Sequence, residues 1–292
     1  MTSAAAACVI CGTPRATDAE TGSVRSNVRA FRAEHFVIWR CTACKSIHAQ
    51  DDVDLAHYYA HYPVFDAALD WKLRAVYGNM LKRLRESGLK PTDKVLDYGC
   101  GKGVLVQFLR EQGYDASGWD RYAEGWSDDS VLKSSYDCVV SQDVIEHVES
   151  PHALLKELHG MTKAGGIVSI GTPDAAALDL KKPEDFVHAL HLPYHRHILS
   201  MAALERAGEQ AGFTVRTRYD TMYNNTLVPT MNPRFVLHYV RCRDDVFDLV
   251  VEPVAFTWKM FTPLTPFFIL FGYFFDRHTD IQVIFHKPAE AA

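Results

Sequence analysis

The sequence has no surplus of basic residues. Lys and Arg number 31 against 36 Asp and Glu, so the formal net charge of the 292-residue chain is −5. The sequence pI is about 6.3. Binding to nucleic acid normally requires a basic surface that faces the phosphates. We therefore expect no nucleic-acid partner.

The sequence also lacks an export signal and an uninterrupted membrane-spanning run. Its start, Met1–Ala7, has no basic segment and too short an apolar stretch for a signal peptide. The most apolar stretch, 253–275, is interrupted by Lys259, Pro263 and Pro266, whereas a spanning helix needs about 20 apolar residues. We expect a cytoplasmic protein, and its seven cysteines then favour metal binding over disulfides.

No repeat or low-complexity linker divides the chain, but its pattern changes along its length. Apolar strands alternate with amphipathic helices over residues 91–220, which is typical of an α/β fold with a doubly wound, mostly parallel sheet. We predict a zinc-ribbon-like β element over 1–50, a helical linker or lid over 51–90, and the α/β domain over 91–292. An apolar insertion interrupts this domain at about 221–278.

A glycine-rich turn follows the first strand of the α/β pattern. The strand Lys94–Tyr98 leads into Gly99, Gly101 and Gly103, and a helix begins at Val104. Such turns bind nucleotide-like ligands, because glycine lets the backbone approach the ligand. Since position 104 is valine, the third glycine is not where the G-x-G-x-x-G dinucleotide fingerprint requires it.

Asp97 indicates that the ligand of this turn is positively charged. Its carboxylate would repel a pyrophosphate but attract the ammonium and sulfonium of S-adenosylmethionine (SAM). A unit-charge pair at about 4 Å contributes roughly 4 kcal/mol at an effective dielectric constant of about 20, before desolvation. Asp120, 21 residues beyond Gly99 at the end of the second strand, can bind both ribose hydroxyls. The pattern favours SAM over NAD.

In this order, the motifs resemble those of class I SAM-dependent methyltransferases. The four matching stretches are Val95–Gly103, Gly118–Asp120, Tyr136–Val148 and Lys163–Gly166. The resemblance implies cofactor contacts from Asp97, Gly99, Cys100, Gly101, Asp120, Gln142 and Asp143. One departure is that only fifteen residues separate Asp120 from Tyr136, where the family fits a helix and a third strand. The family's usual adenine contact is therefore hard to place, and Ser127 and Asp128 are the candidates.

Asp143, Glu146 and His147 allow a second interpretation. Ubiquinone-biosynthesis O-methyltransferases, which the stretch resembles, hold a divalent cation with two acids and a histidine at such positions. Here the first acid is a shorter aspartate. The alternative is that Asp143 and His147 line the cofactor pocket while Glu146 stabilises the start of a helix.

Four cysteines near the N-terminus form two C-x2-C pairs, Cys8 with Cys11 and Cys41 with Cys44, separated by 29 residues. Each pair can present two thiolates to one tetrahedral metal ion. We predict a closed, structural Zn²⁺ site, with free thiols as the alternative.

Two histidines are candidates for the chemistry of methyl transfer. His195 and His197 lie in a stretch that resembles a "P-x-H-x-H-x-x-S" motif of the methyltransferase family, and histidine suits a general base near neutral pH. The alternative is that they fix the loop by hydrogen bonds. Tyr58, Tyr59 and Tyr62 belong either to a lid or to a helix that packs on the core.

We therefore predict a methyltransferase that transfers the methyl group of SAM to an oxygen, with carbon or nitrogen as alternatives, of a small-molecule or lipid-linked acceptor. The rival functions are a non-catalytic SAM-binding protein with a zinc ribbon for partners, and an NAD-dependent oxidoreductase. The insertion predicts short helices that cap the acceptor pocket, form a homodimer contact or lie on a membrane surface.

Overall fold

The computed structural model describes residues 7–62, 68–252, 255 and 257–289. The chain divides into two compact units. The cysteine unit is built from Met1–Val64, Pro173–Ala203 and Asn225–Asp280, and the sheet unit from Phe65–Thr172, Leu204–Asn224 and Ile281–Ala292. This division does not follow the predicted boundaries at residues 50 and 90, because a strand from the 173–203 segment pairs with the N-terminal strands.

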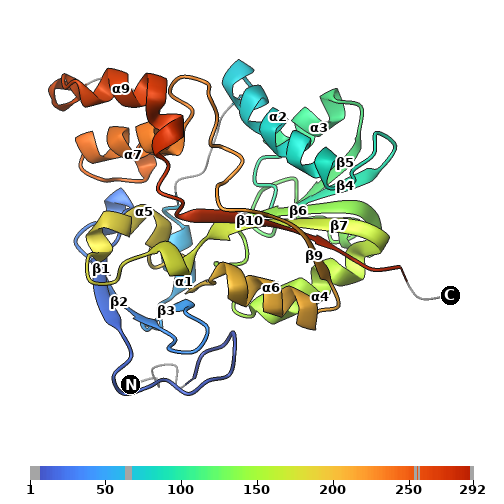
Figure 1. The fold of residues 1–292 in the computed structure, drawn as a ribbon, viewed down its shortest axis with the longest axis horizontal. Coiled ribbons are helices and arrows are strands. Elements are labelled where there is room, and N and C mark those ends of the chain that lie inside the picture. Colours follow the sequence, from blue (N-terminus) through green and yellow to red (C-terminus); the bar gives the residue numbers. More distant parts are fainter. Residues whose placement is uncertain (1–6, 63–67, 253–254, 256, 290–292) are drawn as a thin grey trace. The chain divides into compact units, whose positions relative to one another are not determined.

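The sheet unit contains a six-stranded sheet with the strand order β5-β4-β6-β7-β10-β9 (Figure 1). The strands are β4 (Lys94–Tyr98), β5 (Asp115–Trp119), β6 (Tyr136–Gln142), β7 (Thr162–Pro173), β9 (Thr214–Tyr219) and β10 (Asp280–His286). β4 runs parallel to β5 and β6, and β6 runs parallel to β7, whereas β9 and β10 are antiparallel. The predicted mostly parallel, doubly wound sheet is confirmed.

Helices cover both faces of this sheet. α2 (Trp71–Glu86) and α3 (Val104–Glu111) lie on one face, and α4 (Pro151–Met161) and α6 (Met201–Gln210) on the other (Figure 1). On α2 the apolar side chains of Met80 and Leu84 are buried in the core with Val95 of β4. The side chain of Ser150 caps α4 by accepting a hydrogen bond from the Ala153 amide, in keeping with the preference for serine at this position.

The chain reverses its direction across the sheet at β4. It passes from β4 to β5 on one side and then returns to β6 on the other side. Between β5 and β6 the described chain forms only the short 3-10 helix η2 (Val131–Lys133) and no third strand, as the short spacing predicts. Ligands of doubly wound sheets bind where the strand order reverses, at the carboxyl ends of the strands. The end of β4 is therefore the expected site.

The cysteine unit contains a smaller sheet with the order β1-β2-β3-β8, in which every neighbouring pair is antiparallel. The strands are β1 (Thr21–Arg25), β2 (His35–Arg40), β3 (Ile47–Ala49) and β8 (His197–Ile198). Short helical segments accompany them: η1 (Arg29–Phe31), α1 (Leu55–Tyr59), η3 (Ala175–Ala177), η4 (Pro183–Phe186) and α5 (Val187–Leu190). Ile38, Ile47 and Ile198 are buried in one apolar cluster of this unit.

The apolar insertion forms short helices, as predicted. They are α7 (Pro233–Cys242), α8 (Asp248–Val251), η5 (Trp258–Met260), α9 (Leu264–Phe271) and η6 (Gly272–Phe275). α7, α8, η5 and α9 contribute to an apolar cluster that includes Phe235, Met260 and Phe268. Pro263 is the N-cap residue of α9, so proline separates α9 from η5. None of the described helices combines the length and apolarity that crossing a bilayer requires.

Candidate functional site

The turn between β4 and α3 depends on three left-handed glycines. Gly99, Gly101 and Gly103 have φ values of +85°, +51° and +74°, which side chains other than glycine rarely adopt. A Cβ added at Gly99 would lie 2.4 Å from the Val144 side chain, and one at Gly103 would lie 2.1 Å from the Trp126 ring. A Cβ at Gly101 would meet nothing within 4 Å. The turn is packed at its two ends and open at its centre.

Asp97 lies buried at the carboxyl end of β4. Burial raises the pKa of its carboxyl group to about 7, and the nearby Asp120 carboxylate contributes to this rise. No hydrogen-bond donor of the described residues pairs with this carboxylate. A buried carboxylate without such a partner is costly when ionised. A cation bound beside it would remove this cost.

Asp120 joins the end of β5 to the glycine turn. Its Oδ2 accepts a hydrogen bond from the Gly101 amide at 3.0 Å. Its Oδ1 accepts from the amides of Tyr122 and Ala123 at 2.8 and 2.9 Å. A carboxylate has about four acceptor positions, so these bonds leave capacity for a ligand hydroxyl. Asp120 thus orders the turn, a role that its sequence position did not reveal.

The ends of β6 and β7 form the neighbouring part of this sheet edge. The Gln142 side chain donates to Ser169 Oγ at 3.3 Å, while its Oε1 is buried with no partner among the described residues. Gly171 leaves room for it, because a Cβ there would lie 2.0 Å from Gln142 Oε1. Asp143 is exposed, with φ of +53°. Cys100 is half-buried, and burial raises the pKa of its thiol.

Two tyrosines near Asp97 were missed by the sequence analysis. Burial raises the pKa of Tyr77 on α2, and the Asp97 carboxylate raises it further. Burial likewise raises the pKa of Tyr223, with contributions from Tyr77, Asp143 and Asp97. The two rings are stacked with their centroids 6.3 Å apart. Asn79 Nδ2 donates a hydrogen bond to the Tyr223 carbonyl at 2.8 Å. The only sign of this site in the sequence is Tyr77, a tyrosine among the apolar residues of α2.

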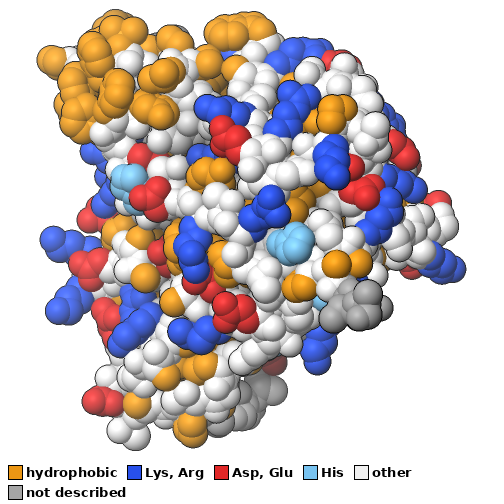
Figure 2. Space-filling model, turned by 45° about the vertical axis from the view of Figure 1, so that its right-hand side comes forward, with side chains coloured by type: hydrophobic (Ala, Val, Ile, Leu, Met, Phe, Trp, Pro, Cys, Tyr) orange, Lys and Arg blue, Asp and Glu red, His pale blue; other side chains and the backbone are white. Residues whose placement is uncertain are grey.

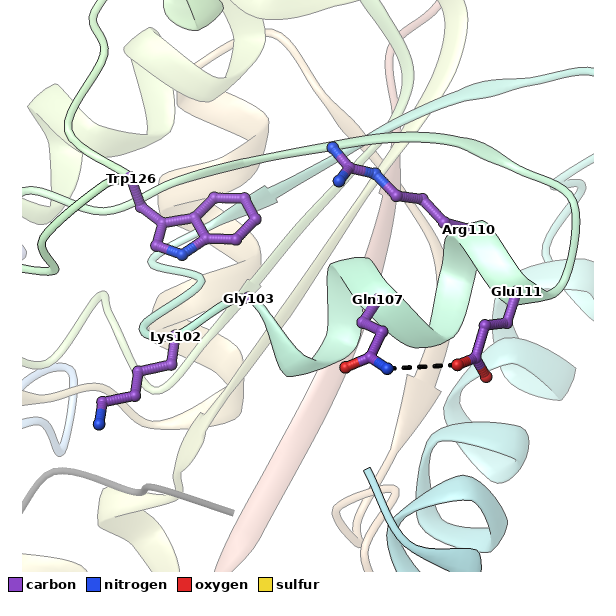
Figure 3. Close-up of a pocket in the computed structure, with 6 residues that line it drawn as sticks. All are labelled: Lys102, Gly103, Gln107, Arg110, Glu111 and Trp126. Atoms are coloured by element: carbon purple, nitrogen blue, oxygen red, sulfur yellow. Dashed lines mark hydrogen bonds between the residues drawn. The ribbon is translucent and has the colours of Figure 1, made fainter. Parts of the chain in front are cut away.

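Trp126 lies beside the start of α3 in the shortened segment between β5 and β6. Figure 3 shows its indole across from the start of α3, where a groove runs along this helix. The groove is lined by Trp126, Lys102, Gly103, Gln107, Arg110 and Glu111. The predicted adenine contacts Ser127 and Asp128 are both exposed, and a hydrogen bond from Ser130 lowers the pKa of Asp128. Their role stays a prediction, and Trp126 is the aromatic ring nearest the turn in this segment.

The four predicted metal ligands come together in the cysteine unit. All four sulfur atoms of Cys8, Cys11, Cys41 and Cys44 lie within 4.8 Å of one another. Cys8 Sγ is 3.5 Å from Cys44 Sγ, and Cys11 Sγ is 3.6 Å from Cys41 Sγ. Tetrahedral zinc with Zn–S bonds of about 2.3 Å places its sulfur ligands roughly 3.8 Å apart. The donor set and its spacing fit a zinc ion.

Both cysteine pairs adopt the same turn. The Gly12 amide donates to the Cys8 carbonyl at 2.8 Å, and the Lys45 amide donates to the Cys41 carbonyl at 3.1 Å. Gly12 and Lys45 both have left-handed φ values, +73° and +64°. Lysine rarely adopts this conformation. The matching turns point the two sulfur atoms of each pair to one place.

His197 lies next to this cluster. It is buried in β8, and its Nδ1 is 3.1 Å from Nδ1 of His48, whose Nε2 is 3.1 Å from Cys8 Sγ. If Cys8 is a thiolate, His48 must donate from Nε2 and therefore accept at Nδ1 from His197. This contact matches the alternative of a loop-fixing histidine.

His195 has a different environment. It is buried, and its Nδ1 donates to the Ala189 carbonyl at 2.9 Å. The proton on Nδ1 leaves the lone pair of the neutral ring on Nε2. Tyr58, Tyr59 and Tyr62 pack around the ring of Tyr194 in the cysteine unit, in agreement with the packing alternative.

The second metal interpretation stays a prediction, since a Glu146 carboxylate oxygen and a His147 ring nitrogen lie within 4.8 Å of each other. Glu146 is buried, and the exposed Asp143 does not join Glu146 and His147 in any group of described residues close enough to hold one ion.

Comparisons with known proteins match the part of the chain that contains the glycine turn. A family model described as a methyltransferase domain matches residues 70–218, about half of the chain. The ubiquinone biosynthesis O-methyltransferase of Aeromonas salmonicida is 26% identical over 151 residues, which cover 42% of this chain and 63% of that protein. Its counterpart in Chromobacterium violaceum is 25% identical over 176 residues, covering 50% and 76%.

This chain thus spans less than two thirds of the first relative's length. Among solved structures, a SAM-dependent methyltransferase from Archaeoglobus fulgidus aligns with a TM-score of 0.46 and 17% identity, covering 79% of this chain and all of that chain. The cysteine cluster and the helices of the insertion lie outside the residues that the family model matches.

Proposed function

The chain belongs to the methyltransferase domain family, and from this premise we propose that it transfers the methyl group of SAM to an oxygen of a small-molecule or lipid-linked acceptor. The names of the relatives support oxygen as the methylated atom. The observation that carries the proposal is Asp97, a buried carboxylate that no described hydrogen-bond donor stabilises. It suits a cationic ligand.

The residues around the glycine turn fit SAM. Asp97 offers the negative charge for its amino group, Asp120 retains an acceptor position for one ribose hydroxyl, and Gly101 leaves open space for the ligand. When bound, SAM supplies an electrophilic methyl group on a sulfonium. A dinucleotide would instead bring its pyrophosphate to the two carboxylates, which would repel it. We further propose contacts from Gly99, Cys100, Gln142 and Asp143, and packing of the Trp126 ring against the adenine.

His195 is our proposed general base for the acceptor hydroxyl. Because its Nδ1 proton is held by the Ala189 carbonyl, the neutral ring presents a basic Nε2 atom. For His197 we propose a positioning role at the cysteine cluster, through His48. The two histidines of the motif thus have separate roles.

For the four N-terminal cysteines we propose a structural zinc ion. Four thiolate ligands complete a tetrahedral site, so no position remains for a substrate. The zinc would stabilise the segment that leads into the small antiparallel sheet, because metal binding supplies folding free energy to segments with little core of their own.

The test combines binding with turnover. Calorimetry should detect SAM binding and no comparable NAD binding. Purified protein given methyl-labelled SAM and a bacterial lipid and metabolite extract should then yield a labelled product by mass spectrometry. The variant His195→Ala should lose the product and keep SAM binding. Binding of SAM without any labelled product would support a non-catalytic binding protein instead, and tight NAD binding would support the oxidoreductase.

A further inference from the structure

Apolar side chains gather on the outside of the insertion (Figure 2). Of the twelve large apolar side chains that are exposed in the described chain, eight lie between residues 258 and 275. Phe261 is 87% exposed and Trp258 is 80% exposed. Single exposed apolar residues are normal on soluble proteins, but a concentration of this kind marks an interaction surface. We call the side chains of Trp258, Phe261, Leu264, Leu270, Phe271 and Phe274 the aromatic patch.

The helix α9 is apolar on the side that faces the protein and also on its outer side. Phe268 and Thr265 are buried among the insertion helices, while Leu264, Leu270 and Phe271 on the same helix are exposed. A helix that only covers a core has a polar outer face. The exposed face of α9 is therefore as apolar as a surface that contacts a binding partner or a membrane.

Two parts of the insertion contain basic residues but no acidic ones. No acidic residue occurs in α7 or between residues 253 and 275. Arg234 on α7 lies over the Phe268 ring at 4.8 Å, and its pKa is lowered by burial and by the neighbouring Arg277 and Arg241. Its Nε atom is buried with no hydrogen-bond partner among the described residues.

Only part of this positive charge is neutralised within the protein. Arg241 pairs with Asp185 at 3.3 Å, and Lys259 pairs with Asp244 at 3.1 Å. Arg277 donates to the Asp185 backbone carbonyl at 3.1 Å. Among the described residues, no carboxylate lies within ion-pair distance of Arg234 or Arg277. These two guanidinium groups are therefore suited to an external anion.

We propose that the aromatic patch docks on an anionic membrane surface, with its rings in the lipid interface and Arg234 and Arg277 facing the lipid phosphates. Helices too short to span a bilayer, with aromatic side chains and flanking cations, suit this position. A two-fold contact with a second copy fits less well, because it would bring the same uncompensated cations together. The proposal does not depend on the methyl transfer activity.

The test is co-sedimentation of the full chain with vesicles of phosphatidylcholine mixed with phosphatidylglycerol, compared with phosphatidylcholine alone. We expect binding to the mixed vesicles and a blue shift of Trp258 emission that Trp258→Phe removes. Phe261→Ser with Phe274→Ser should weaken binding at least tenfold. Arg234→Gln and Arg277→Gln should each weaken it by about fivefold, on the mixed vesicles only.

Tyr122→Ser is the matched control, since Tyr122 is 73% exposed but lies outside the insertion. It should bind like the original chain, and the variants of Trp258, Phe261, Phe274 and Tyr122 should keep their melting temperature because these aromatic side chains are exposed. The proposal is overturned if the protein binds neither kind of vesicle. It is also overturned if the Phe261 and Phe274 substitutions, or the charge of the lipid, leave the binding unchanged. A dimer that Phe261→Ser dissociates, without vesicle binding, would assign the patch to a second copy.

Discussion

Asp97 illustrates how a single residue can favour function over stability. Its carboxylate is buried at the end of β4, close to the Asp120 carboxylate, and its pKa is raised to about 7. The folded protein therefore binds a proton at Asp97 more readily than the unfolded chain, where an aspartate titrates near 4. As pH rises from about 4 through 7, ionisation of Asp97 lowers the stability of the ligand-free protein. Such a cost is expected where a cation binds.

The first prediction concerns the pH dependence of SAM binding. A cationic ligand pairs with the ionised carboxylate, so SAM affinity should fall as pH drops below about 7, approaching tenfold per pH unit well below that pKa. Asp97→Asn should bind SAM at least tenfold more weakly at pH 8 and should lose this pH dependence. Calorimetry across pH 5 to pH 8 measures both. Asp115→Asn, at the exposed start of β5, is the matched control and should behave like the original protein.

The second prediction separates the two histidines of one motif. His195→Ala should lower the methyl transfer rate by about 100-fold or more, because a general base contributes on this scale, and should leave SAM affinity unchanged. His197→Ala should instead weaken zinc retention, because His197 reaches the cysteine cluster through His48. Single-turnover rates and zinc content after chelator treatment are the measurements. Equal effects of both substitutions on both measurements would contradict the division.

At the scale of elements, the turn between β4 and α3 combines two demands. The Gly103 end must leave space for Trp126, whereas the Gly101 centre is open. A tight turn does not by itself require the open space beside Gly101. The open centre is suited to a ligand that passes close to the backbone.

The third prediction compares these two glycines. Gly103→Ala should destabilise the protein by about 2 to 4 kcal/mol, since it combines a left-handed residue with a displaced Trp126 ring. Gly101→Ala should cost only about 1 to 2 kcal/mol, for its backbone conformation, but should weaken SAM binding at least tenfold. Urea unfolding and calorimetry provide the two values. Unchanged SAM affinity in Gly101→Ala would mean that the ligand does not pass over this turn.

At the scale of the whole molecule, the cysteine cluster and the candidate site at Asp97 belong to different compact units. The family match begins at residue 70 and covers the glycine turn but none of the four cysteines. The helices of the insertion also lie outside it. The chain thus joins a methyltransferase domain to a segment with a four-cysteine cluster and to an exposed aromatic patch.

The fourth prediction addresses this combination. The purified protein should contain one zinc ion per chain, and Cys41→Ser should lose it with a drop in melting temperature, because the metal contributes to folding. Cys242→Ser, outside the cluster, is the matched control and should retain the zinc. SAM affinity should persist in both variants, since Asp97 and the glycine turn lie in the sheet unit. Absence of zinc from the purified protein would refute the proposed metal.

Much of this protein was determined by patterns between near neighbours in the sequence. The alternation of apolar strands and amphipathic helices specified the mostly parallel sheet, and the short spacing from Asp120 to Tyr136 indicated the missing strand. The glycine turn and the paired cysteines could be located because their turns form within a few residues. In these cases the geometry follows from local backbone preferences.

Only the tertiary structure decided which distant side chains meet. His48 and His197 are separated by 149 positions and Asn79 and Tyr223 by 144, and no local pattern predicts such contacts. The same holds for the pairing of β8 with β3, which places the 173–203 segment with the N-terminal strands. Such contacts form because the packed core brings these segments together, and their free energy depends on burial that the sequence pattern does not specify.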